Sequence, residues 1–81
     1  MSSDDYIWVN KVGERYYVGR GFTSDEEMPS HEGRRSFASL NDALAYAHSV
    51  DANDAYPAEY GVMVIGDARR ELQLSRLEGK Q

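Results

Sequence analysis

Two hydrophobic stretches at the start of the chain are separated by a short polar turn and predict a β-hairpin. Residues 6–10 (YIWVN) combine β-branched and aromatic side chains, which is typical of a strand. Gly13 supplies the backbone freedom that a tight turn needs, and residues 15–22 (RYYVGRGF) read as the returning strand. Gly19 and Gly21 indicate a bulge or a bend at the end of the pairing.

A polar segment follows the hairpin and lacks any hydrophobic period. Residues 23–33 contain four acidic side chains together with Pro29 and Gly33, so we expect an irregular loop. Residues 34–37 (RRSF) add a short third strand that ends at Phe37. The four acids of the loop are Asp25, Glu26, Glu27 and Glu32.

The clearest helical pattern lies in the middle of the chain, over residues 39–50 (SLNDALAYAHSV). Ser39 is a favourable N-cap, and Asp42 three residues later completes a box-like arrangement. Apolar side chains then recur at the spacing of one helix face, which predicts that this face is buried. Its members are Leu40, Ala43, Leu44 and Ala47.

The C-terminal third predicts two more strands. A polar connection over residues 51–59 leads into residues 60–66 (YGVMVIG), which have the β-branched character of a strand. After a turn at residues 66–69, the leucines of residues 70–77 (RELQLSRL) alternate with polar side chains, as in a strand with one solvated face. Residues 78–81 are expected to fray.

A helix is the competing interpretation of residues 69–77, because Leu74 and Leu77 also fit one helical face. With the strand preferred, the order is two strands, a short third strand, one helix and two strands. This order is typical of an α+β two-layer sandwich, with one helix on a four- to five-stranded antiparallel or mixed sheet. Residues 1–81 form a single small domain, and a chain of this size has a modest core.

Both faces of the predicted sheet carry apolar side chains, although one helix can cover only one of them. In the first strand, Tyr6 and Trp8 point to one side, while Ile7 and Val9 point to the other. Two explanations remain open. Loops and the C-terminal segment fold over the second face, or that face is a patch that docks on a partner or on a second copy of the chain.

Composition narrows the classes of partner. The net charge is −5, from 14 acidic and 9 basic residues, which disfavours nucleic acid and anionic membranes and favours a basic protein surface. The absence of cysteine excludes disulfides and thiolate chemistry and fits a cytoplasmic protein. No apolar run reaches the length of a membrane span, and the N-terminus does not have the pattern of a secretory signal.

No motif in the sequence indicates a reaction. The two histidines, His31 and His48, do not stand at the spacing of a metal site, and no nucleophile motif or complete dinucleotide fingerprint is present. No carboxylate lies in an apolar run that would raise its pKa. We therefore expect a protein that is not an enzyme and that uses no metal or cofactor.

The acidic side chains occur in groups, which suggests how the protein acts. Grouped carboxylates on a rigid scaffold can occupy a basic groove that is built for phosphates. We expect the loop at 23–33 to make the main contact, because exposed loops commonly carry binding function. The predicted partner-binding residues are Asp25, Glu26, Glu27, Glu32, Asp51 and Asp54, with Tyr6 and Trp8 on the uncovered face.

The small, acidic, cysteine-free chain, with its hairpin, its SLNDALAYA helix and its returning strands, resembles several phage-encoded anti-CRISPR proteins. The resemblance is one of general architecture over most of the chain. It implies an inhibitor that blocks the nucleic-acid-handling surface of a defence complex. Two alternatives stay open: a self-associating accessory domain, and a small nucleic-acid-binding module in which several arginines gather near the hairpin. These are Arg15, Arg20, Arg34 and Arg35.

Overall fold

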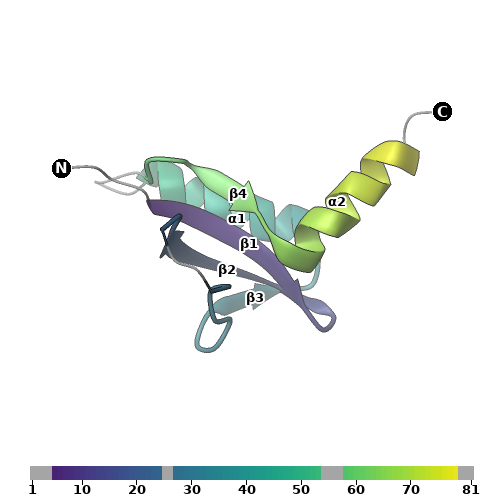
Figure 1. Cartoon of the computed structure of the whole chain (residues 1–81), viewed down its shortest axis with the longest axis horizontal. Coiled ribbons are helices and arrows are strands. Elements are labelled where there is room, and N and C mark those ends of the chain that lie inside the picture. Colours follow the sequence, from purple (N-terminus) through teal and green to yellow (C-terminus); the bar gives the residue numbers. More distant parts are fainter. Residues whose placement is uncertain (1–4, 25–26, 54–57, 79–81) are drawn as a thin grey trace.

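The structure of the protein is a computed structural model that describes residues 5–24, 27–53 and 58–78. It has an α+β fold, as the sequence predicts, with one four-stranded mixed sheet and two helices (Figure 1). The elements, in chain order, are β1 (Asp5–Val12), β2 (Arg15–Phe22), β3 (Arg35–Phe37), α1 (Leu40–Asn53), β4 (Val62–Val64) and α2 (Gly66–Glu78).

The sheet is built around the predicted hairpin, and its strand order is β3-β2-β1-β4. β1 and β2 pair antiparallel without interruption, from Asp5 opposite Phe22 to Val12 opposite Arg15. Gly13, with a φ of 64°, provides the tight turn between them. The expected bulge or bend near the end of β2 is wrong, because the register stays constant over the whole hairpin. β3 extends the sheet antiparallel to β2, and β4 lies parallel to β1.

Helix α1 covers one face of the sheet and closes the core. The Ser39 hydroxyl accepts a hydrogen bond from the Asp42 N–H at 3.2 Å, which confirms the predicted N-cap. Ala43 and Ala47 of the predicted stripe are fully buried, and Leu40 and Leu44 are partly buried against the same core. The strands contribute Ile7, Val9, Tyr16 and Val18 to this core.

The predicted last strand is wrong, since this part of the chain forms α2. The expected turn at residues 66–69 is the first turn of this helix, which starts at Gly66 with a φ of 58°. Ala68 is fully buried in the core, whereas Leu74 is 54% exposed. Figure 1 shows the second half of α2 extending away from the sheet. The segment is rich in Arg, Leu and Glu, which are strong helix formers, and the spacing of two leucines did not outweigh that preference.

Candidate functional site

The second face of the sheet is closed over Trp8. Its side chain has no exposed surface, although it lies on the face opposite the core residues Ile7 and Val9. The indole lies against Gly19 of β2, its direct partner in the ladder, and the Arg34 guanidinium lies 5.9 Å from the ring centroid. Trp8 therefore offers no surface to a partner in this structure. Tyr6, on the same face, is partly buried.

The segment between β2 and β3 is anchored to this second face. His31 packs edge-on against Tyr17 of β2, with ring centroids 4.9 Å apart. The Arg34 N–H donates a hydrogen bond to the His31 carbonyl at 3.1 Å, and Gly33 turns the backbone with a φ of 73°. Of the two explanations for the apolar second face, the structure thus favours a covering loop at Trp8.

The predicted acidic contact residues do not all have the same role. Glu27 and Glu32 are exposed on the loop. The Asp51 carboxylate instead accepts a hydrogen bond from the Ala58 N–H at 2.9 Å, which ties the end of α1 to the chain that leads into β4. The remaining three predicted residues lie outside the described part of the chain: Asp25, Glu26 and Asp54.

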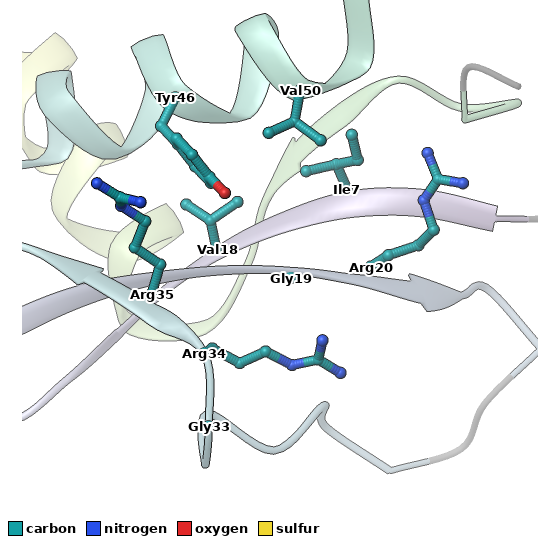
Figure 2. Close-up of a pocket in the computed structure, with 9 residues that line it drawn as sticks. All are labelled: Ile7, Val18, Gly19, Arg20, Gly33, Arg34, Arg35, Tyr46 and Val50. Carbon is teal, nitrogen blue, oxygen red and sulfur yellow. The ribbon is translucent and has the colours of Figure 1, made fainter. Parts of the chain in front are cut away.

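A notch opens at the outer edge of β2, next to the start of the short strand β3. It has a volume of about 510 Å³ and lies between α1, β2 and the segment that enters β3 (Figure 2). Its apolar floor comes from the sheet and from α1, and three arginines surround it. The notch is lined by Ile7, Val18, Gly19, Arg20, Gly33, Arg34, Arg35, Tyr46 and Val50.

The three arginines reach the notch from different directions. Figure 2 shows Arg35 on the same side of β2 as α1, with Arg34 on the opposite side. The Arg35 guanidinium lies 5.2 Å from the Tyr46 ring centroid and 5.8 Å from that of Phe37. Arg20, in contrast, forms an ion pair with Asp5 at 3.4 Å. The notch therefore has a positive rim, although the chain as a whole is acidic.

The sequence predicts that four arginines gather near the hairpin, and three of them, Arg20, Arg34 and Arg35, line the notch from different sides. Arg15 lies apart from the notch and donates a hydrogen bond from Nε to the Ser36 hydroxyl at 2.9 Å. No pattern in the sequence predicts the notch. It arises because β3 pairs with only the first part of β2, up to Val18 opposite Arg35.

A separate polar network joins α2 to the hairpin. Glu71 forms an ion pair with Lys11 at 2.9 Å and accepts a short hydrogen bond from the Tyr16 hydroxyl. The hydrogen bond from Tyr16, followed by that from Lys11, lowers the pKa of the Glu71 carboxyl. The hydrogen bond to Glu71 raises the pKa of both Tyr16 and Lys11. This arrangement stabilises the ionised carboxylate and docks the helix.

The described residues do not assemble a metal site, because no three potential ligands among them come together. His31 contacts Tyr17, and His48 is exposed on α1. Within the described segments no helix is long and apolar enough to cross a membrane. The network around Glu71, in which three pKa values are shifted, connects α2 to the hairpin.

Comparison with known proteins adds no relative. No protein-family model, no curated protein and no solved structure matches this chain.

Proposed function

We propose that this chain is a non-enzymatic binding protein that docks on a basic surface of a partner protein through the loop between β2 and β3. The observation that carries the proposal is an anchored loop with exposed side chains. His31 and Arg34 fix the loop on the sheet, while Glu27 and Glu32 are exposed and Met28 is 58% exposed.

Anchoring matters because an ordered loop loses less conformational entropy on binding than a free one. Carboxylates on its surface attract a basic partner over a long range, and an exposed methionine adds apolar area that adapts to the contact. A groove that holds nucleic acid is the basic surface that such a loop fits. This is the class of surface that the resemblance to anti-CRISPR inhibitors implies, and the proposed action is competition with nucleic acid.

The proposal is tested by affinity capture from a bacterial lysate with three forms of the protein. The loop variant is E27K/E32K, and the matched control is E14K/E59K, which makes the same charge change at two other exposed positions. We expect the wild type and the control to retain a common protein and the loop variant to lose it. Equal retention by both variants would show that the loop does not make the contact.

A second measurement tests the mode of binding. If this protein occupies the nucleic-acid groove of the captured partner, a single-stranded oligonucleotide should compete with it and release the partner. The release is tested at an ionic strength at which salt alone does not release the partner. Release by salt but not by the oligonucleotide would contradict competition for a nucleic-acid surface and leave only a general charge attraction.

A further inference from the structure

We propose that the outer edge of β4 pairs with the same edge of a second copy of this chain, so that their two sheets join into one. β4 and β3 are the edge strands of the sheet and lie on opposite sides of it (Figure 1). Self-pairing goes beyond the proposed docking function and does not depend on it. Three features of β4 support it: unpaired backbone groups, the absence of the usual edge protection, and a sequence that is symmetric about Met63.

The outer edge of β4 carries backbone groups that have no partner among the described residues. In the parallel ladder with β1, the Gly61 carbonyl accepts a hydrogen bond at 2.8 Å and the Ile65 N–H donates one at 2.9 Å. Alternate residues of a parallel strand use their backbone groups on the same side, so those of Val62 and Val64 point away from β1. Within the described part of the chain, neither valine makes another hydrogen bond.

β4 also lacks the features that normally prevent edge-to-edge pairing. Soluble proteins protect an edge strand with a charged side chain, a proline or a bulge. The opposite edge strand, β3, begins with the charged Arg35. Residues 60–66 (YGVMVIG), which include β4, contain neither a charged residue nor a proline, and Met63 is 40% exposed. The edge is therefore neutral within a chain of net charge −5, and a second copy can approach it with little charge repulsion.

The sequence of β4 is self-complementary in an antiparallel pair, which favours a second copy as the occupant. Val62-Met63-Val64 reads the same in both directions, so a two-fold axis at Met63 places Val62 opposite Val64 of the second copy. The two valines of each such pair then exchange hydrogen bonds through their outward N–H and carbonyl groups. The two Met63 side chains meet at the axis, in a pair without hydrogen bonds, where side chains come closest. One contact thus satisfies the backbone groups and covers the exposed methionine.

Sedimentation equilibrium of the purified protein tests the association. A strand of three residues makes a small contact, which is typical of weak, transient interfaces. We therefore expect a reversible shift from monomer toward dimer as the concentration rises from about 10 µM to about 1 mM. A wild-type protein that stays monomeric over this range would overturn self-pairing and leave the edge of β4 to a strand of a different protein.

Matched charge variants locate the contact. Met63→Lys places like charges on the axis and should weaken association by about ten-fold or more. Leu74→Lys is the control, because Leu74 is 54% exposed and lies beside Lys11 and Gly13 at the hairpin turn, away from the outer edge of β4. It should retain the wild-type association constant, and circular dichroism checks that both variants fold. Equal association of Met63→Lys and the wild type would contradict pairing through β4.

Disulfide formation tests the register. The chain has no cysteine, so a single introduced cysteine can form a protein disulfide only with a second copy. Residues opposed in a pair without hydrogen bonds have Cα atoms about 4.5 Å apart, which is within the range of a disulfide. Met63→Cys should therefore form a covalent dimer under air oxidation at least about ten-fold faster than Leu74→Cys, since the pair is held in place. Equal rates in the two variants would contradict a two-fold axis at Met63.

Discussion

Trp8 and Gly19 face each other across β1 and β2, and the indole occupies the space where any larger residue at position 19 would place its Cβ. A Cβ on Gly19 would lie 2.7 Å from Cε2 of Trp8. The glycine is therefore not a break in the strand. It allows a large aromatic side chain to lie flat on the sheet, and the loop between β2 and β3 then covers that side chain.

This relationship predicts that Gly19→Ala destabilises the fold by about 1–3 kcal/mol, the usual cost of forcing extra volume into a packed site. The control is Gly21→Ala, whose Cβ would meet Trp8 at 3.4 Å and Tyr6 at 3.5 Å, both ordinary contact distances. We expect Gly21→Ala to change the free energy of unfolding by less than about 0.5 kcal/mol. Urea denaturation measures both, and equal effects would contradict the assigned role of Gly19.

Arg34 should protect Trp8 from solvent. The guanidinium lies over the indole on the outer side of the sheet, so Arg34→Ala should open a path to the ring. We expect stronger quenching of Trp8 fluorescence by acrylamide and a shift of its emission to longer wavelength. Arg35→Ala is the matched control, because Arg35 packs on Tyr46 and Phe37 instead. If acrylamide quenches Trp8 equally in both variants, the Arg34 side chain does not shield the ring and the rest of the loop covers it.

The helix cap gives a third prediction, on stability alone. Ser39→Ala removes the acceptor for the Asp42 N–H and should cost about 1 kcal/mol. Ser75→Ala makes the same chemical change at an exposed position inside α2, away from either helix start, and should stay within about 0.5 kcal/mol of the wild type. Thermal and urea unfolding of the two variants provide the comparison, and an equal loss in both would argue against the cap.

The parts of the fold that sequence could predict are those set by local pattern. The hairpin follows from two β-rich stretches around Gly13, and α1 follows from the N-cap Ser39 and one apolar stripe. The hydrophobic pattern does not indicate α2, because the inner face of this helix consists of Ala68, Glu71 and Leu72, which do not form an apolar stripe. Its high intrinsic helix propensity was the available signal.

The two candidate surfaces, the loop between β2 and β3 and the notch, depend on contacts between residues that are distant in sequence. A local sequence pattern does not indicate such contacts. The loop between β2 and β3 packs on the sheet through His31 and Tyr17, a contact that no periodicity indicates. The notch exists because β3 pairs with β2 only up to Val18, and the adjacent arginines Arg34 and Arg35 then lie on opposite sides of β2 (Figure 2). The net charge of −5 does not indicate the arginines of the notch, because a sum over the chain does not show which charges lie at one edge.

The Glu71 network sets the pH range in which the docked helix contributes to stability. The folded pKa of Glu71 is lowered, so its contribution is present above the ordinary carboxyl pKa of 4.5 and is lost as pH falls through the folded value. The folded pKa values of Tyr16 and Lys11 are raised. Their contribution is therefore present below the ordinary values of 10.0 and 10.5 and is lost as pH rises through the folded values.

We therefore expect the melting temperature to be highest between about pH 5 and pH 9. Glu71→Gln should lower the maximum melting temperature and make its decrease toward acid pH less steep, because the variant has no carboxyl group at position 71 that could be protonated. Tyr16→Phe should also lower the plateau, whereas Tyr17→Phe should not, since the ring of Tyr17 contacts His31 from the other face. Melting curves across this pH range measure all three variants. An acid limb in Glu71→Gln as steep as that of the wild type would assign the pH dependence to other carboxylates.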